Sequence, residues 1–311
     1  MRFLRCSAPL CTSLFVLAVV ALPSQVAAED TALAELASAE SEYGFTQTRT
    51  CTTSGIHACD AGQEPLPVEW NRPTVGYDIH DQGSEYLHPG EELTDDLKHS
   101  VITSFDAWNE QDCSSFEMIY TGKNSSEFVG WDENISPDEN FNIILWQDDQ
   151  WPYPHYNAVA LTTVTFSRSS GQILSADIEF NTADHHFTDS DSNVEVDLRN
   201  TLTHEVGHFL GLDHSPDANA TMYATAPQGE TSKRILHEAD VAGLCHIYPV
   251  GKEYEDSGQN GGPTPGGNDD DDSRCSTASA TPDPVLAILA FLLVGSVFVR
   301  RKIYGRALPT A

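Results

Sequence analysis

The stretch of residues 203–215, THEVGHFLGLDHS, constrains the fold of this chain more than any other part of the sequence. Its apolar residues recur at helical spacing, and His204 and His208 are four residues apart, so both side chains leave the same face of a helix. Gly211 can adopt the positive φ that ends a helix, and the turn that follows can bring His214 back toward the other two histidines. The pattern therefore predicts a helix that ends in a turn, with three imidazoles gathered beside it.

The residue types in this stretch are those of a catalytic zinc site. Three imidazoles that leave one coordination position open are typical of catalytic zinc, whereas structural zinc is usually enclosed by protein ligands rich in cysteine. Glu205 follows the first histidine, so its side chain is rotated away from the line of ligands but stays close to them. Zinc lowers the pKa of bound water from about 15.7 toward 7, and a nearby carboxylate can accept a proton as that water attacks a carbonyl. We predict one catalytic Zn²⁺ held by His204, His208 and His214, with Glu205 as the general base.

The motif HExxHxxGxxH, read from His204 to His214, resembles the signature of the metzincin metalloproteases. These enzymes carry a methionine turn beneath the zinc, and Met222, eight residues after His214, resembles that methionine. The serine directly after the third histidine, Ser215, resembles the pattern of the matrixin branch, a matrix-metalloprotease-like group that also has bacterial members. The resemblance covers about residues 65–250. It implies a metzincin-like catalytic domain with a twisted, mostly parallel sheet, an antiparallel edge strand, an active-site helix that binds zinc and a C-terminal helix.

The same resemblance implies where a peptide substrate binds. Residues 158–166 are similar to the edge strand that receives the substrate backbone as an additional strand. Residues 223–227 would form one wall around the substrate residue that follows the scissile bond, and Asp240 matches an acidic residue that supports the methionine turn. The expected substrate-binding residues are Ala160, Leu161, Thr162 and Tyr223.

Two functions are the main candidates, and a third, a metalloenzyme acting on a non-peptide amide or ester, is disfavoured because the edge strand suits extended peptides. The first is a secreted or surface-anchored zinc-dependent endopeptidase in which Glu205 assists a zinc-bound water in hydrolysing peptide bonds. The second is a catalytically silent, zinc-containing surface binding module of the same fold. The presence of Glu205 favours the enzyme, and protein or peptide substrates are the expected partners.

The periodicity of the sequence independently predicts an α+β domain. Residues 95–109 carry apolar side chains on one helical face, with Asp95 and Asp96 in the first turn. Helices are also expected at residues 194–210 and 235–247. Strands are expected at residues 74–79, 115–120, 141–146, 158–166 and 173–180, the last two joined by a turn at residues 169–171. Strands with interspersed helices and no repeated strand–helix period favour α+β over a doubly wound fold.

Both ends of the chain resemble targeting segments. Residues 1–28 have the basic start, apolar run and small residues of a cleavable secretory signal. Residues 29–64 form an N-terminal segment or a short pro-region, and residues 251–274 a linker rich in Gly, Pro and Asp. Residues 275–311 resemble the MYXO-CTERM sorting signals of some Gram-negative bacteria, the alternative being a plain membrane anchor. We therefore expect an exported protein at the cell surface or outside the cell, in contact with the membrane only through its tail.

An exported chain is expected to pair its cysteines. Four remain when the signal and Cys275 are set aside, and they permit three connectivities. We favour Cys51–Cys59 across a short loop, and a second disulfide that joins Cys113, after one predicted helix, to Cys245 in another. Cys51 has a second possible role, as a thiolate that caps the zinc in a precursor, but a disulfide with Cys59 is the preferred interpretation.

The charge of the chain excludes one class of partner. The sequence has 47 acidic and 16 basic residues, a formal net charge of −31, and no basic cluster outside the termini, so it offers nucleic acid no counter-charge. Carboxylates at Asp189, Asp191 and Glu195 make Ca²⁺ a second candidate cofactor, beside the simpler interpretation of a solvated acidic surface. We expect a monomer.

Overall fold

The structure, a computed structural model of the whole chain, describes residues 40, 42–52, 58–153 and 158–254, together with the backbone of Leu286–Leu292. The expected signal segment, and most of the linker and tail, lie outside these residues. Within the described part of the chain, no helix combines the length and apolar character needed to cross a bilayer.

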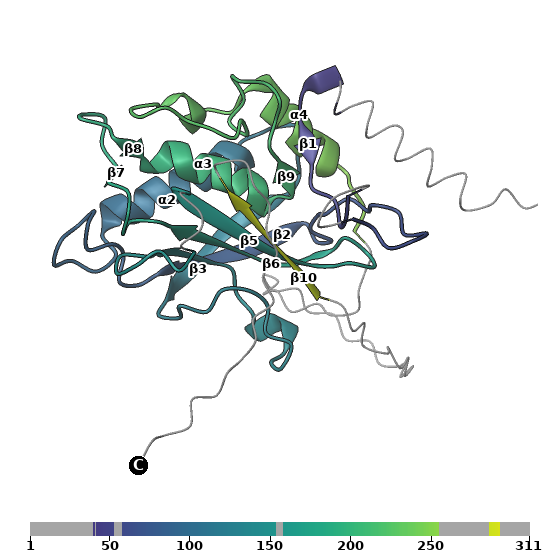
Figure 1. Cartoon of the computed structure of the whole chain (residues 1–311), viewed down its shortest axis with the longest axis horizontal. Coiled ribbons are helices and arrows are strands. Elements are labelled where there is room, and N and C mark those ends of the chain that lie inside the picture. The colour runs from purple at the N-terminus through teal and green to yellow at the C-terminus, as the bar shows by residue number, and fades with distance from the viewer. Residues whose placement is uncertain (1–39, 41, 53–57, 154–157, 255–285, 293–311) are drawn as a thin grey trace, which may run out of the picture. The chain divides into compact units, whose positions relative to one another are not determined.

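A mixed sheet with strand order β10-β5-β6-β4-β2-β3 forms the framework (Figure 1). Strand β2 pairs parallel with β3 and β4, and β4 pairs parallel with β6, whereas β5 runs antiparallel to β6. This confirms the predicted α+β architecture with a mostly parallel sheet, in which β5 is the outermost strand among residues 40–254. Its strands are β2 (Thr74–His80), β3 (Glu117–Asn124), β4 (Ile143–Trp146), β5 (Ala160–Ser167), β6 (Ile173–Phe180) and β10 (Leu286–Leu292).

The outer edge of β5 is paired with β10, a strand from the C-terminal apolar run. The two strands are antiparallel, from the pair Leu286 and Ser167 to the pair Leu292 and Leu161. The sequence pattern of this run predicts only a sorting signal or anchor, and no strand. Strand pairing between segments so far apart leaves no local signal in either segment.

The helices with both ends in the described part of the chain are α2 (Asp95–Asn109), α3 (Leu198–Phe209) and α4 (Glu238–Ile247). Helix α2 has the predicted bounds because the Thr94 hydroxyl accepts a hydrogen bond from the Leu97 amide, at 3.1 Å, and caps its first turn. Helix α3 begins four residues later than predicted, since the preceding residues Val196–Asp197 form the short strand β8. Helix α4 begins after its N-cap, His237.

The core lies between the sheet and the helices α2 and α3, which cover the same side of the sheet (Figure 1). The rings of Tyr77 on β2 and Phe105 on α2 stack with centroids 3.7 Å apart, and Phe209 on α3 meets Phe105 edge-on at 5.7 Å. Trp108 donates its indole N–H to the Thr203 carbonyl at 2.9 Å. These contacts fix α3 against α2 and thereby set the position of the histidines on α3.

Short elements complete the domain. Strand β1 (Thr46–Gln47) pairs antiparallel with β9 (Leu212–Asp213), directly after α3, and β7 (Phe187–Thr188) pairs parallel with β8. Single-turn 3₁₀ helices occupy Pro137–Glu139 (η1) and Ser232–Arg234 (η2).

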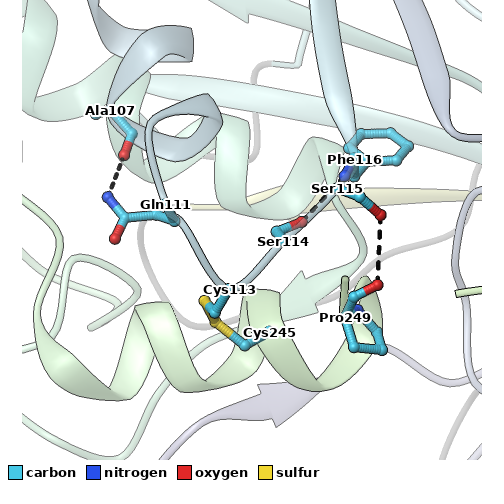
Figure 2. The surroundings of a disulfide bond; sticks show 8 residues. All are labelled: Ala107, Gln111, Cys113, Ser114, Ser115, Phe116, Cys245 and Pro249. Carbon is cyan, nitrogen blue, oxygen red and sulfur yellow. Dashed lines mark hydrogen bonds between the residues drawn. A yellow bond between two sulfur atoms is a disulfide. The ribbon is translucent and has the colours of Figure 1, made fainter. Parts of the chain in front are cut away.

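Two disulfides join Cys51 to Cys59 and Cys113 to Cys245, the connectivity favoured from the sequence. Figure 2 shows the second disulfide, which links the loop after α2 to helix α4. Next to it the Val250 amide donates to the Cys113 carbonyl at 3.1 Å, so the backbone also joins these segments. Because Cys51 is part of a disulfide, its thiol is not available to cap a metal in this structure.

Candidate zinc centre

The start of helix α3 is anchored by a buried carboxylate. Asp197 is the N-cap, and its side chain accepts the Asn200 amide at 2.7 Å. The same carboxylate accepts two hydrogen bonds from Arg234 on η2, one from Nε and one from Nη2. A carboxylate at a helix N-terminus also faces the positive end of the helix dipole. The helix therefore enters the site at a fixed position.

Three imidazoles converge at the end of this helix, as the sequence predicts. One ligand atom from each of His204, His208 and His214 lies within 4.8 Å of the others, and the ring centroids are 4.9–5.3 Å apart. His204 and His208 are fully buried, and His214 is partly exposed. Among the described residues, this is the one group of three or more His, Cys, Asp or Glu side chains that could hold a metal ion.

Backbone carbonyls select the tautomer of two of these rings. Nδ1 of His204 lies 2.6 Å from the Thr221 carbonyl, and Nδ1 of His208 lies 2.8 Å from the Leu212 carbonyl. A carbonyl can only accept, so each Nδ1 carries the proton and each Nε2 keeps its lone pair. Nε2 of both His204 and His214 is buried and has no hydrogen-bond partner in the described part of the chain. Such oriented, neutral imidazoles are the ligand set that Zn²⁺ prefers.

Burial keeps these histidines neutral. Desolvation is the largest cause that lowers the pKa of His204 and His208 well below the usual value, and repulsion from neighbouring cations and imidazoles lowers it further. The pKa of His214 is also lowered, mainly by burial, while the adjacent Asp213 opposes the shift. Because a metal binds only the deprotonated ring, the site is prepared for a cation at neutral pH.

Gly211 makes the turn that returns His214 to the site. Its φ is +95°, and a Cβ there would lie 2.3 Å from the Val68 carbonyl oxygen. Its own amide donates to the His208 carbonyl at 2.9 Å, and its carbonyl accepts the Thr48 amide at 2.9 Å. Both the positive φ and the close approach require glycine, as expected from the motif.

Glu205, the residue after His204 on α3, is fully buried. Burial raises its pKa to about 8, while a hydrogen bond from Thr162 and the positive charge of Lys233 act in the opposite direction. Its Oε2 accepts the Thr162 hydroxyl at 2.5 Å, whereas its Oε1 is buried without a hydrogen-bond partner among the described residues. A bound divalent cation would favour the ionised form, which is the form that a general base requires.

Met222 lies directly beneath the helix that carries the first two histidines. A Cβ on Gly207 would approach the Met222 sulfur to 2.1 Å, so the thioether fills the space left by that glycine. Asp240 on α4 holds this turn: its carboxylate accepts the amides of Thr221 at 2.7 Å, Met222 at 2.9 Å and His237 at 2.8 Å. Since the Thr221 carbonyl orients His204, Asp240 supports the position of this candidate metal ligand through the turn.

Asp240→Asn is expected to lower the free energy of unfolding by about 1–3 kcal/mol. In the native protein three backbone N–H groups donate to the two carboxylate oxygens of Asp240, whereas the asparagine side chain would place an NH₂ donor opposite some of these N–H groups. Denaturant unfolding of the metal-free protein measures this change. Glu238→Gln is the matched control, since Glu238 lies exposed in the first turn of the same helix. Equal stability of the two variants would contradict the assigned role of Asp240.

The expected substrate-binding residues lie in two different environments. Ala160, Leu161 and Thr162 on β5 are fully buried, and the Thr162 side chain faces Glu205 rather than solvent. Tyr223 is partly exposed, and its backbone bridges to Ser215 just after the third histidine. Only the backbone of β5 is therefore placed to meet a substrate strand, on the edge that β10 occupies.

Lys233 is a buried cation near the centre that sequence analysis missed. Its ammonium group donates to the carbonyls of Tyr223 and Thr225, and its side chain is almost fully buried. Desolvation lowers its pKa to about 8, although Glu230, Asp240 and Glu205 favour the charged form. Nothing in the polar sequence around residue 233 indicates burial, because the carbonyls that receive this lysine come from the turn after Met222.

The carboxylates considered for Ca²⁺ are close to basic side chains. Asp189 lies 2.8 Å from the His88 Nε2, and Asp191 lies 2.5 Å from the Arg234 Nη1. Glu195 lies 3.9 Å from the His186 Nδ1. These pairings favour a polar surface held together by ion pairs and hydrogen bonds.

Comparison with known proteins agrees with this geometry. The family model described as Matrixin, Peptidase_M10, matches residues 69–249, more than half of the chain. Metalloendoproteinase 1-MMP of Arabidopsis thaliana is 28% identical over 186 residues, 58% of this chain and 44% of that protein. Human matrilysin is 34% identical over 86 residues, 28% of this chain and 32% of that protein. Karilysin of Tannerella forsythia is 22% identical over 180 residues, 58% of this chain and 33% of that protein. The chain thus spans between about a third and less than half of the length of these relatives.

Proposed function

Because the chain belongs to the matrixin family, we propose that it is a zinc-dependent endopeptidase that hydrolyses peptide bonds of protein substrates. The proposal depends on three converging imidazoles and on the buried Glu205, the residue after the first of these histidines. One carboxylate oxygen of Glu205 accepts a hydrogen bond from Thr162, and the other has no hydrogen-bond partner in the described part of the chain. His204, His208 and His214 would hold the zinc. When bound, zinc supplies a Lewis acid that polarises a carbonyl and makes water a better nucleophile.

Glu205 moves the proton in this reaction. As the oxygen of water forms a bond to the carbonyl carbon of the substrate, the Glu205 carboxylate accepts a proton from that water. The carboxylic acid then gives the proton to the amide nitrogen as the bond between carbon and nitrogen breaks. The products are a carboxylic acid and an amine, the acid then passes the second proton of the water to the amine to give a carboxylate and an ammonium group, and Glu205 returns to its ionised state.

The outer edge of β5 is the proposed binding place of the substrate backbone. It accepts an antiparallel strand over Leu161–Ser167, since β10 pairs with it there. An extended peptide could form the same ladder through backbone groups alone, which leaves substrate choice to side-chain contacts such as those at Tyr223. Residues 223–227 would line the binding place of the substrate residue after the scissile bond.

This arrangement predicts competition between β10 and the substrate. A chain ending at residue 254 is expected to show a lower KM for an extended peptide than a chain ending at residue 292, with a similar kcat, because only the longer chain retains β10. Steady-state kinetics on the two chains measures the difference. The same KM for both would show that β10 does not cover the substrate edge in solution.

We further propose that the protein is exported by a cleavable signal and sorted to the cell surface through its tail, with a Gram-negative bacterium as its source. The two disulfides support an oxidising compartment. Processing of the tail would also remove β10 and free the edge of β5. We expect the mature enzyme to be monomeric, and mass spectrometry of its termini tests the processing.

The decisive experiment is cleavage profiling of a mixed peptide library by the purified zinc-loaded protein, with and without a chelator. Cleavage at internal peptide bonds that stops with the chelator and returns with added zinc is the expected result. Stoichiometric zinc without cleavage of any peptide would overturn the proposal and favour a zinc-containing binding module.

A further inference from the structure

Thr162 on β5 directs its hydroxyl group into the zinc centre. The side chain is fully buried, and its Oγ1 lies 2.5 Å from Oε2 of Glu205 and 3.2 Å from the Glu205 carbonyl oxygen. A hydroxyl has one proton to donate, and the shorter distance selects the carboxylate oxygen. A strand of the sheet is therefore hydrogen-bonded directly to the proposed general base.

This hydrogen bond makes the two oxygens of Glu205 different. Oε2 is held by Thr162, while Oε1 is buried and has no hydrogen-bond partner among the described residues. A buried polar atom without a partner is costly unless water or a ligand meets it. Oε1 is thus the oxygen that remains to accept a proton from an attacking water.

The residue type and its place on β5 suit this task. Threonine is β-branched, so its χ1 is restricted and its hydroxyl direction is well defined on a strand. Strand β5 pairs with β6 from Ala160 to Phe166, with Thr162 opposite Ile178, which gives the hydroxyl a rigid support. A side chain fixed on a rigid element holds a reacting group more accurately than a loop does.

We infer that Thr162 is a positioning residue: its hydroxyl fixes the Glu205 carboxylate so that Oε1 faces the reacting water. The inference rests on the proposed function, since it concerns the same glutamate. It also means that the strand whose backbone receives the substrate is the strand that orients the base. A shift of β5 would therefore move the peptide and the base together.

Replacement of the hydroxyl tests this role. Thr162→Val, which keeps the shape of the side chain, is expected to lower kcat about ten- to a hundred-fold, because misplacing a reacting group by about 1 Å costs about that much. KM and zinc content should stay close to those of the unchanged protein. Thr162→Ser keeps the donor and should restore kcat to within about threefold. Ser175→Ala on the neighbouring strand β6 is the control, because it also removes a buried hydroxyl, and the Ser175 hydroxyl has no hydrogen-bond partner in the described part of the chain.

Unchanged kcat in Thr162→Val would overturn the inference, and so would a serine variant as impaired as the valine variant. If the valine variant does not fold, Thr162→Ala removes the hydroxyl with less bulk and is judged by the same outcomes.

Crystal structures of the zinc-loaded forms give a readout independent of activity. The Glu205 carboxylate should change its rotamer in Thr162→Val and keep it in Thr162→Ser. Superimposable carboxylates in the unchanged protein and Thr162→Val would refute the positioning role. This measurement holds even if the unchanged protein cleaves no peptide, an outcome that would refute the proposed function alone.

Discussion

Glu205→Gln is expected to lower kcat for peptide hydrolysis by about 10²–10⁴-fold, the usual contribution of a positioned general base. Glutamine has nearly the same shape as glutamate. Its amide oxygen can accept the hydrogen bond from the Thr162 hydroxyl that Oε2 of Glu205 accepts in the native protein, at 2.5 Å. It cannot take a proton from water at neutral pH. Because Glu205 is not one of the three converging histidines that could hold the metal, the variant should keep its zinc.

Two measurements accompany the loss of activity. Elemental analysis should give the same zinc content for the variant and the unchanged protein, and single-turnover kinetics should place the loss in the chemical step rather than in binding. Glu110→Gln, at the exposed end of α2, is the matched control and should leave kcat unchanged. Cleavage at the native rate by repurified Glu205→Gln would exclude this residue as the base.

The sequence predicts the convergence of the three histidines well, because their arrangement is almost entirely local. His204 and His208 are brought together by the helical period, and His214 follows after one turn at Gly211. The signal that predicts helix α2 is likewise local, since the capping residue Thr94 directly precedes the residues that carry the apolar period. Where one element contains the whole signal, sequence and structure agree.

The start of α3 shows where local signals fail. Periodicity extends the helix back to residue 194, but Val196 and Asp197 pair with Phe187 and Thr188 as a short parallel ladder. The Asp197 carboxylate then serves as the N-cap and receives Arg234 from η2. Both partners are distant in sequence, so the boundary depends on tertiary contacts that overrule the helical pattern.

The role of Thr162 could not be predicted because β5 is buried along nearly its whole length. A half-exposed strand reveals its inward face by alternation, whereas a strand covered on both faces does not. The register with β6 and the packing of α3 on β5 decide that Thr162 meets Glu205. The sequence places Thr162 on the strand expected to receive the substrate through backbone groups, and it does not indicate the contact of the Thr162 hydroxyl with Glu205.

Gly211→Ala is expected to weaken zinc binding and to lower the free energy of unfolding by about 3 kcal/mol. A residue with a Cβ at φ +95° carries a backbone penalty of about 1–2 kcal/mol. The added methyl group would also lie 2.3 Å from the Val68 carbonyl oxygen, and relief of such overpacking costs about 1–3 kcal/mol. The chain can relieve this contact only by moving the turn, and the turn carries His214.

Gly251→Ala separates these two effects. Gly251 also has a positive φ, +81°, but a Cβ there would meet nothing within 4 Å. In this control the free energy of unfolding should fall only by the backbone penalty of a positive φ. Its affinity for zinc, measured by competition with a chromogenic chelator, should not change. Denaturant unfolding of both metal-free variants gives the stability difference, which should be about 1–3 kcal/mol in favour of Gly251→Ala. If both variants were equally stable and bound zinc equally well, the close approach of Gly211 to Val68 would not be what holds His214 in the site.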